Sequence, residues 1–401
     1  MALSAPPLAL YVHFPWCVRK CPYCDFNSHA MQAEAPVDAY LQALEEDLRA
    51  QAPAASGRPI VSIFIGGGTP SLMPPAAVAR LLESVGAQLD LRQCTEVTME
   101  ANPGTIERGR FADYRGAGIT RVSLGAQSFQ PALLVALGRI HSADETRRAV
   151  EELHAAGIDN FNIDLMVGLP DQDTAGAVAD VEQALALRPA HISHYQLTLE
   201  PGTVFGGRPP AGLPAHDAAA DMQERCHERL AEAGFVRYEV SAFAREGRRC
   251  EHNLNYWQFG DYLGIGAGAH GKCTDAARAR IERTTREREP RRYMARGAYG
   301  LPASQVVRGA ELPFEFMMNA LRLVDGFDTA LYEQRTGLSW SAIADRVERL
   351  ESRGLLERQG SHWRPSQRGG RFLNDMLLEF VHLPRDDRPG LGRKNPTKPN
   401  T

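Results

Sequence analysis

The stretch that decides the fold runs from Leu8 to Cys24 and reads Leu-Ala-Leu-Tyr-Val-His-Phe-Pro-Trp-Cys-Val-Arg-Lys-Cys-Pro-Tyr-Cys. Its first part, Leu8–Phe14, is a nearly continuous apolar run, which is typical of a β-strand covered on both faces. Directly after it, a short loop carries Cys17, Cys21 and Cys24. Three thiolates on one loop can converge on a [4Fe–4S] cluster and leave one iron without a protein ligand. A substrate or cofactor can then bind metal at that iron.

Zinc is the alternative ligand for these three cysteines. A structural zinc site takes four closed ligands, commonly from paired C-x₂-C units. No second pair exists among the remaining cysteines, which are Cys94, Cys226, Cys250 and Cys273. His13 or His29 would have to supply the fourth ligand, so the sequence favours the cluster.

The first 240 residues alternate short apolar runs with longer helical segments. Further strands are predicted at Ile60–Ile65, Thr95–Glu100, Thr120–Leu124, Phe161–Met166 and His191–Leu197. Helices are predicted at Val37–Gln51, Pro75–Gln88, Ala143–Ala156, Thr174–Leu187 and Asp217–Ala233. Repeated strand–helix units predict an α/β fold whose parallel sheet has right-handed crossovers. Periodicity does not distinguish a partial barrel from an open, doubly wound sheet.

From about Pro290 the pattern changes to short helices around a small hairpin. The helices are predicted at Leu312–Leu323, Thr329–Gln334, Ser341–Arg353 and Arg371–Phe380, and the hairpin strands at Leu355–Arg358 and His362–Pro365. This pattern resembles a winged-helix module. Between Glu311 and Glu379 it holds eleven acidic residues and nine arginines. Because that balance gives no basic surface, we expect no nucleic-acid binding.

Composition is that of an ordinary soluble protein, with 43% hydrophobic and 23% charged residues and a formal net charge of −4. No apolar run is long enough to span a bilayer, and the first residues do not form a signal peptide. We therefore expect a cytoplasmic protein with reduced thiols. The expected divisions are a barrel over 1–240, a linking segment over 241–300, a winged-helix-like domain over 301–382 and a disordered tail over 383–401.

The cysteine spacing C-x₃-C-x₂-C, with the aromatic Tyr23 before the last cysteine, resembles the signature of radical S-adenosylmethionine (SAM) enzymes. The run Gly66-Gly-Gly-Thr-Pro70 follows the second predicted strand, as does that superfamily's glycine-rich segment, which meets the methionine part of SAM. The resemblance implies a partial (β/α)₆ barrel, a [4Fe–4S] cluster and SAM.

The stretch from Tyr11 to Pro170 resembles one branch of that superfamily, the oxygen-independent coproporphyrinogen III oxidases and their HemW relatives. The resemblance implies SAM contacts from Tyr11, Gly67, Gly68, Thr69, Glu100, Gln127, Arg139 and Asp164. These residues lie at or just after predicted strand ends, the face on which α/β barrels build their sites. By the same resemblance Tyr11 and Tyr23 flank SAM, Glu100 binds its polar groups and Asp164 its ribose hydroxyls.

Each of these residues also has a structural alternative. Glu100 could be a carboxylate on the barrel rim and Gln127 a turn residue. Arg139 and Asp164 could form an ion pair. The order and spacing of the set favour the SAM site.

Two features are similar to the HemW-type haem chaperones within that branch. Phe26 stands where the oxidases carry a further cysteine, and the chain reaches Tyr11 almost at once. The run from His252 to Trp257 also fits the H-N-x-x-Y-W pattern that this type associates with haem.

The resemblance makes His252, Tyr256 and Trp257 the candidate haem residues, because histidine ligates haem iron and aromatic rings pack on porphyrin. The alternative is that they are core residues with a hydrogen-bonded histidine. His270, in the glycine-rich run Gly264–Gly271, is a second candidate axial ligand.

The resemblance thus implies a haem chaperone that carries the cluster and SAM and passes haem to an acceptor apoprotein. An electron donor such as flavodoxin or ferredoxin is expected if SAM is cleaved, and peripheral contact with membrane proteins is compatible with this role. The first alternative is oxidative decarboxylation of coproporphyrinogen III by a 5′-deoxyadenosyl radical. The second alternative, from a different class, is a zinc-stabilised nucleic-acid-binding protein.

Overall fold

The computed structural model describes residues 3–32, 34–104, 109–296 and 303–381. The tail 383–401, which the sequence predicts to be disordered, lies outside the described residues. Within the described part of the chain the main sheet has twelve strands in the order β14-β13-β12-β11-β1-β4-β5-β6-β7-β8-β10-β9. No described helix is long and apolar enough to cross a membrane.

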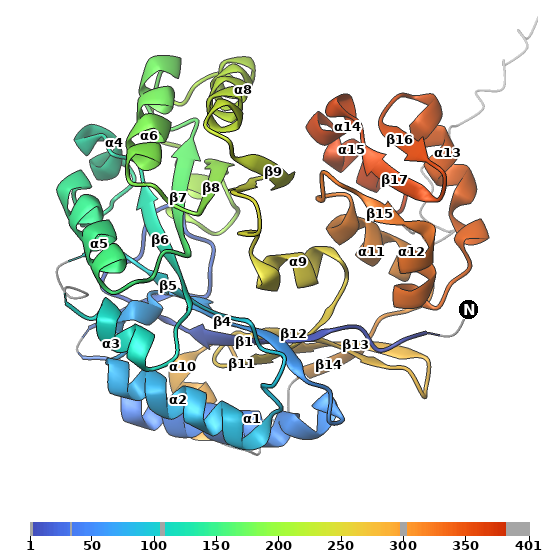
Figure 1. Cartoon of the computed structure of the whole chain (residues 1–401), viewed down its shortest axis with the longest axis horizontal. Coiled ribbons are helices and arrows are strands. Elements are labelled where there is room, and N and C mark those ends of the chain that lie inside the picture. Colours follow the sequence, from blue (N-terminus) through green and yellow to red (C-terminus); the bar gives the residue numbers. More distant parts are fainter. Residues whose placement is uncertain (1–2, 33, 105–108, 297–302, 382–401) are drawn as a thin grey trace, which may run out of the picture.

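The six predicted strands are neighbours in this sheet, and each pairs with the next in parallel. They are β1 (Leu8–Phe14), β4 (Ile60–Gly67), β5 (Glu96–Ala101), β6 (Arg121–Gln127), β7 (Phe161–Val167) and β8 (His191–Gln196). Figure 1 shows that they curve into an open half barrel with helices on its outer side. The α/β fold class is confirmed, and the partial barrel is the correct choice between the two sheet forms.

The outer helices cover the convex face of the sheet. The longer ones are α1 (Val37–Ala55), α2 (Pro75–Gln88), α5 (Ala143–Ala155), α6 (Thr174–Ala186) and α8 (His216–Glu232), and the shorter ones are α3 (Phe111–Gly116) and α4 (Pro131–Ala136). Helix α7 (Val204–Gly207) lies against the cysteine loop, where the Phe205 N–H donates to the Pro22 carbonyl at 3.0 Å. Helix α5 shows why such segments form. Ser142 and Glu145 make a reciprocal capping box at its start, and Val150 and Leu153, three residues apart, are buried on one face.

The stretch 241–300, expected to be a linking segment, adds strands to the sheet. Its elements are β10 (Ala242–Ala244), α9 (Glu251–Trp257), β11 (Asp261–Ile265), β12 (His270–Asp275), β13 (Arg280–Thr285) and α10 (Pro290–Arg296). Strand β11 pairs in parallel with β1, while β12, β13 and β14 (Ala303–Val306) follow antiparallel. At the other edge β10 lies between β8 and β9 (Val236–Glu239). Strands β12 and β13 are rich in charged and polar residues, so apolar patterning does not reveal them.

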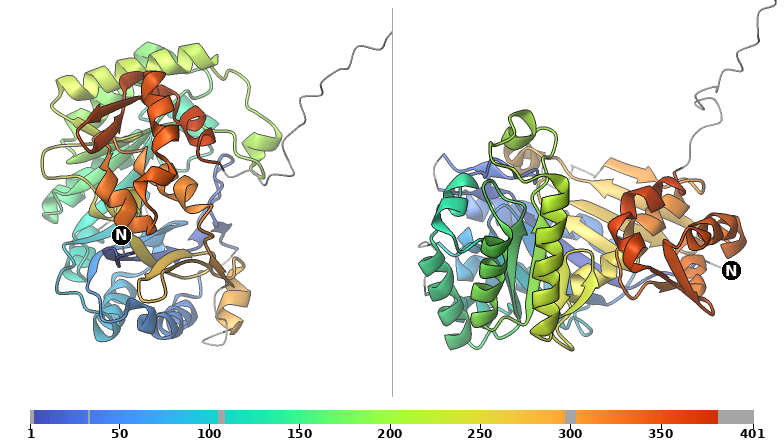
Figure 2. Two further views of the ribbon diagram at one scale, coloured as in Figure 1. Left: turned by 90° about the vertical axis from the view of Figure 1, so that its right-hand side faces the viewer. Right: turned by 90° about the horizontal axis from the view of Figure 1, so that it is seen from above.

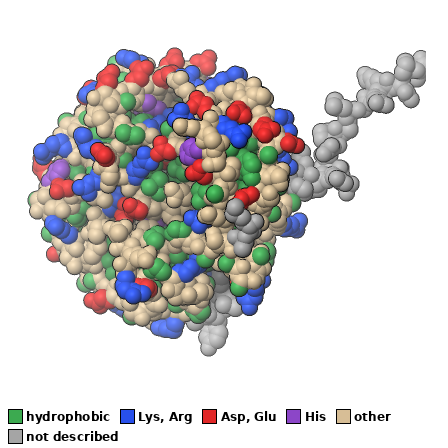
Figure 3. All heavy atoms as spheres, turned by 45° about the vertical axis from the view of Figure 1, so that its right-hand side comes forward, with side chains coloured by type: hydrophobic (Ala, Val, Ile, Leu, Met, Phe, Trp, Pro, Cys, Tyr) green, Lys and Arg blue, Asp and Glu red, His purple; other side chains and the backbone are tan. Residues whose placement is uncertain are grey.

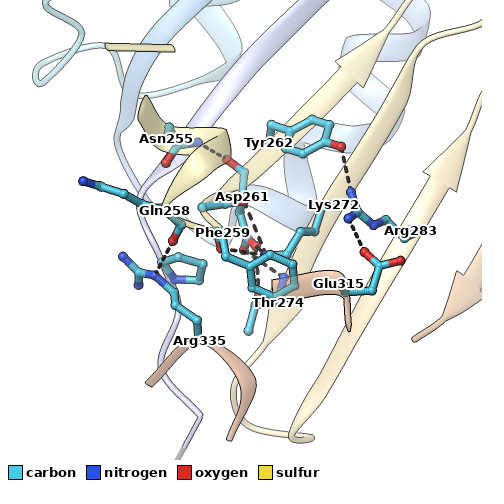
Figure 4. Close-up of polar contacts among 12 residues, drawn as sticks. Asn255, Gln258, Phe259, Asp261, Tyr262, Lys272, Thr274, Arg283, Glu315 and Arg335 are labelled. Atoms are coloured by element: carbon cyan, nitrogen blue, oxygen red, sulfur yellow. Dashed lines mark hydrogen bonds and ion pairs between the residues drawn. The ribbon is translucent and has the colours of Figure 1, made fainter. Parts of the chain in front are cut away.

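A buried ion pair fixes β11 to β12. The carboxylate of Asp261 accepts hydrogen bonds from Lys272 Nζ at 2.8 Å and from the Thr274 backbone N–H at 2.8 Å and hydroxyl at 2.9 Å. Figure 4 shows these groups pointing toward one another beside the ring of Phe259. Arg58 Nη1 adds a further bond to Asp261 at 2.8 Å. The network compensates for burying the charges, because every charged group in it has a partner.

The C-terminal residues form a smaller unit with its own hydrophobic core. Its helices are α11 (Leu312–Ala320), α12 (Thr329–Thr336), α13 (Ala344–Ser352), α14 (Gln367–Arg371) and α15 (Leu373–Leu378), and its sheet has the order β15 (Phe327–Asp328), β17 (His362–Pro365), β16 (Leu356–Gln359). Phe259, between α9 and β11, and Ile281 of β13 also pack in this core. Figure 2 shows the unit against one side of the half barrel. The smaller C-terminal domain that the sequence predicts is confirmed.

Charges of both signs are mixed on the surface. On the face shown in Figure 3, Lys and Arg side chains alternate with Asp and Glu side chains, and no large area of one sign is visible. The described surface on this side therefore lacks the continuous basic stripe by which nucleic-acid-binding domains are recognised.

Candidate cluster and cofactor site

The cysteine loop is held between the end of β1 and the end of β4. A short parallel pair, β2 (Trp16–Cys17) with β3 (His29–Ala30), closes the loop at its base. The Thr69 backbone N–H donates to the Trp16 carbonyl at 2.8 Å. Lys20 Nζ donates to the carbonyls of Phe26 and Ser28, each at 3.1 Å. These bonds hold the backbone of the loop in place without a bound metal.

The three cysteines line one cavity of about 130 Å³ at the C-terminal ends of the strands. This cavity brings together the residues predicted for the cluster and SAM, apart from Tyr11. The predicted residues in it are Cys17, Cys21, Cys24, Tyr23, Gly67, Gly68, Thr69, Glu100, Gln127, Arg139 and Asp164. Tyr23 packs beside Phe205, with their ring centroids 6.4 Å apart.

The surroundings of the thiols are compatible with a bound cluster. Burial raises the pKa of the Cys17 thiol to about 11, and a bound metal reverses this by holding the thiolate. Within the described residues no three His, Cys, Asp or Glu side chains are grouped closely enough to hold one metal ion. A cluster bonds each thiolate to a different iron and needs no such grouping. His13, one candidate for a fourth zinc ligand, uses both ring nitrogens in bonds to Tyr11 and Asn27.

Gly67 brings the backbone of β4 against the cavity. Its φ is +118°, and a Cβ atom there would lie 2.5 Å from His13 Cε1. Only glycine fits both the backbone conformation and the space. The backbone N–H of Gly67 donates to Glu100 Oε2 at 2.9 Å. The glycine-rich segment therefore presents backbone groups to whatever fills the cavity.

Two partly buried carboxyl groups lie on the cavity wall. Burial, and then the charge of Asp164, raises the pKa of Glu100 to about 8. Burial also raises the pKa of Asp164, which accepts hydrogen bonds from Asn162 at 2.7 Å and Ser123 at 3.2 Å. Acidic groups that are destabilised in this way favour a cationic ligand, whose charge offsets their burial. SAM carries positive charge on its sulfonium and on its amino group.

Arg139 bonds to neutral groups and a thiol. Its Nη2 donates to Asn102 Oδ1 at 2.5 Å and to the Gly125 carbonyl at 2.7 Å, and its Nη1 lies 3.6 Å from Cys21 Sγ. The structure shows no ion pair between Arg139 and Asp164 among the described residues. Asn102, which the sequence analysis missed, also donates to Thr69 Oγ1 at 2.9 Å. Its position two residues after Glu100, just past β5, is the signal that could have revealed it.

Gln127 ends β6 in a left-handed conformation, with a φ of +67°. Its Oε1 accepts a 2.6 Å hydrogen bond from the hydroxyl of Tyr195, which also lines the cavity. Tyr195 was not predicted from the sequence, although its place near the C-terminal end of β8 is the signal that could have revealed it. A strained backbone at a site residue is typical of functional positions.

Tyr11 lies in a second cavity, of about 380 Å³, next to the first. Its hydroxyl is 2.9 Å from His13 Nδ1, and burial raises the pKa of Tyr11 well above its usual range. The two cavities share Phe26, Gly67 and Glu100. Of the two tyrosines expected to flank SAM, only Tyr23 borders the cluster cavity itself.

The predicted haem residues on α9 are divided between core and cavity. His252 is 1% exposed, with Nδ1 3.1 Å from Ser62 Oγ and Nε2 3.1 Å from the hydroxyl of Tyr256. Burial lowers the pKa of His252 to about 3. Trp257 lies under the guanidinium of Arg322, 4.4 Å from Cζ to the ring centroid. Only Tyr256 of the three lines the second cavity.

Comparison with known proteins places the chain in a family. The Radical SAM superfamily matches residues 11–200, and the HemN C-terminal domain matches residues 308–372. The protein named Heme chaperone HemW from Escherichia coli (strain K12) is 48% identical over 94% of this chain and 99% of its own length. The chain belongs to the HemW family. Heme chaperone HemW from Haemophilus influenzae is 46% identical over 94% of this chain and 98% of its own length.

This chain shares its architecture with a solved oxidase. Coproporphyrinogen III oxidase (HemN) from Escherichia coli, described as a radical SAM enzyme, superposes with a TM-score of 0.79 over 94% of this chain and 90% of its own. The two sequences are 21% identical, so the likeness concerns the fold. Membership of the radical SAM superfamily implies a [4Fe–4S] cluster and SAM for HemW proteins, and the thiols and the glycine-lined cavity described above fit that pair.

Proposed function

We propose that this protein is a haem chaperone, which binds haem and transfers it to an acceptor apoprotein. The observation that carries the proposal is the near-full-length similarity, at 48% identity, to the Escherichia coli protein named Heme chaperone HemW. Phe26 at the place where the oxidases carry a further cysteine supports the same choice. The acceptor and the electron donor belong to the proposal as classes only: a haem-accepting apoprotein, and a flavodoxin or ferredoxin where SAM is cleaved.

Cys17, Cys21 and Cys24 are the residues that hold the cluster in this proposal, and the same cavity takes SAM. The bound cluster supplies an open iron for SAM and an electron for its reductive cleavage. The chain contributes the rest. The carboxyl groups of Glu100, which accepts a hydrogen bond from the Gly67 N–H, and of Asp164 provide acidic contacts for a cationic ligand.

The test gives the reconstituted protein haem and coproporphyrinogen III in separate anaerobic experiments. We expect a stable haem complex, seen as a Soret band that remains after gel filtration. We expect no protoporphyrinogen and no carbon dioxide from coproporphyrinogen III in the presence of SAM and a reductant. Catalytic decarboxylation without stable haem uptake would replace the chaperone function with that of the oxidase.

A further inference from the structure

His252 cannot ligate haem iron in the conformation that the structure shows. Both of its ring nitrogens lie within hydrogen-bond distance of hydroxyl groups, and the ring stacks on Phe64 with centroids 5.1 Å apart. An iron–nitrogen bond would require the loss of one of these bonds and movement of a side chain that is 1% exposed. A hydrogen-bonded buried histidine of this kind orients its partners.

The partner that His252 orients is Tyr256. Their contact fixes the tyrosine hydroxyl, and the ring of Tyr256 meets that of Tyr262 edge to face, with centroids 4.4 Å apart. Both tyrosines line the 380 Å³ cavity beside the cluster site. His252 therefore does not line this cavity itself but holds the position of Tyr256, which does.

A different histidine faces the same cavity. His270, at the start of β12, is exposed, and its Nδ1 lies 3.3 Å from Thr285 Oγ1. Its Nε2 has no hydrogen-bond partner among the described residues. Burial of the ring and the charges of Arg283 and Arg288 lower the pKa of His270, which favours the neutral imidazole that binds iron.

The rest of the cavity wall combines aromatic rings, one cation and two carboxyl groups. The carboxyl groups are those of Asp25 and Glu100, and burial raises the pKa of Glu100 to about 8, so that Glu100 is largely neutral at pH 7. Phe26 is 59% exposed at its edge, which is unusual for so large an apolar side chain. Arg288 also lines the cavity, and its guanidinium has no partner among the described residues. Asn27 holds this wall in place by donating 2.9 Å hydrogen bonds to the carbonyls of Ala267 and Arg288.

We propose that haem binds in this second cavity with His270 Nε2 as its axial ligand, and that His252 is a positioning residue for Tyr256. The porphyrin packs on Phe26 and Tyr262, and a propionate pairs with Arg288. This inference rests on the proposed haem-chaperone function. Since the two cavities share Gly67 and Glu100, bound haem lies beside the SAM site. The exposed His270 and Phe26 leave an edge of the haem open, which suits a cargo that must be handed on.

The test is a titration of reconstituted full-length protein with haemin, followed by difference spectra and by electron paramagnetic resonance of the ferric haem. We expect His270→Ala to weaken haem binding about 10-fold or more and to change the axial-ligand signature. Added imidazole should restore the signature, which a purely structural role would not allow. His252→Ala should keep the axial signature while weakening binding less. His216→Ala, at an exposed histidine on α8, is the matched control and should bind as the wild type.

The outcomes separate this inference from the function on which it rests. If the wild type takes up no haem, the chaperone function fails. If the wild type binds haem and His270→Ala binds it with the same affinity and signature, only the site is overturned. Iron and sulfide contents equal to those of the wild type show that the His270→Ala variant is folded and loaded. Arg288→Ala should weaken binding about 10-fold through the lost carboxylate pair without changing the axial signature.

Discussion

At the scale of single residues, the thiol of Cys17 tests the cluster. Cys17→Ala should leave the protein folded but without brown colour, because two thiolates cannot hold the cluster in place of three. The measurement is iron and acid-labile sulfide after anaerobic reconstitution. Cys94→Ala removes a thiol outside the loop and should keep its full iron content. Full iron and sulfide in Cys17→Ala would show that this cysteine is not a ligand.

Glu100 should make the stability of the SAM-free protein depend on pH. Its pKa is about 8 in the folded protein and lower in the unfolded chain, so the folded state keeps a proton that the unfolded state loses first. The free energy of unfolding should therefore fall as pH rises from about 5 to 8. Glu100→Gln should remove this fall. At pH 8.5 the variant should be more stable than the wild type by on the order of 2 kcal/mol. Urea unfolding at pH 5 and pH 8.5 checks the prediction, and an equal difference at both pH values contradicts it.

Residue types and spacing predicted which side chains meet at the cluster cavity, but not how each one bonds. Local sequence showed the loop of Cys17 and the glycines of β4, because both act over a few neighbouring residues. It could not show that His252 bonds to Ser62, 190 positions away. The predicted role of a histidine depends on such distant partners, so the motif alone left ligand and core residue equally open.

At the scale of elements, the pairing of β11 with β12 rests on the buried ion pair in Figure 4. Lys272→Met should leave Asp261 with Arg58 as its remaining ion-pair partner among the described residues and cost about 3 kcal/mol of the free energy of unfolding. Arg278→Met breaks an exposed ion pair with Asp275 on the same hairpin and should cost about 0.5 kcal/mol or less. Urea unfolding followed by circular dichroism compares the two variants. Similar costs would show that burial does not strengthen the first pair.

Strands β12 and β13 were not predicted, because backbone pairing and polar contacts place them in the sheet and their apolar content is low. Strand β12 reads His-Gly-Lys-Cys-Thr-Asp and β13 reads Arg-Ile-Glu-Arg-Thr-Thr. Neither has the apolar run that marks β1, because their polar groups are satisfied by partners such as Asp261. Apolar patterning finds strands covered by helices on both faces, and it misses strands stabilised by buried polar networks.

At the scale of the whole molecule, the two main hydrophobic cores are joined by residues that precede the C-terminal unit but pack in its core. Phe259 lies between α9 and β11, and its ring packs with that of Phe316 of α11, at 5.8 Å between ring centroids. The change of pattern near Pro290 predicted a second unit. It could not predict that residues before it complete the second core, because that contact forms between segments far apart in sequence.

Arg322 should couple the C-terminal unit to the half barrel more strongly than Arg371 does. Arg322 bonds at 3.0 Å to Glu239, which is 4% exposed, and it also covers the ring of Trp257. Arg371 reaches Glu224 on α8 in an ion pair that is exposed on both sides. Arg322→Ala leaves a buried carboxylate without its charge partner and should lower the free energy of unfolding by about 2–3 kcal/mol.

Arg371→Ala should change the same free energy by no more than about 0.5 kcal/mol, since exposed pairs contribute little. Urea unfolding followed by tryptophan fluorescence measures both variants. Fluorescence also reports the local change, because Arg322→Ala uncovers Trp257 whereas Arg371→Ala does not touch a tryptophan. If the two variants lose equal stability, the buried contact between Arg322 and Glu239 is not what holds the units together. The interface would then depend on the apolar contacts of Phe259 and Ile281 with the second core.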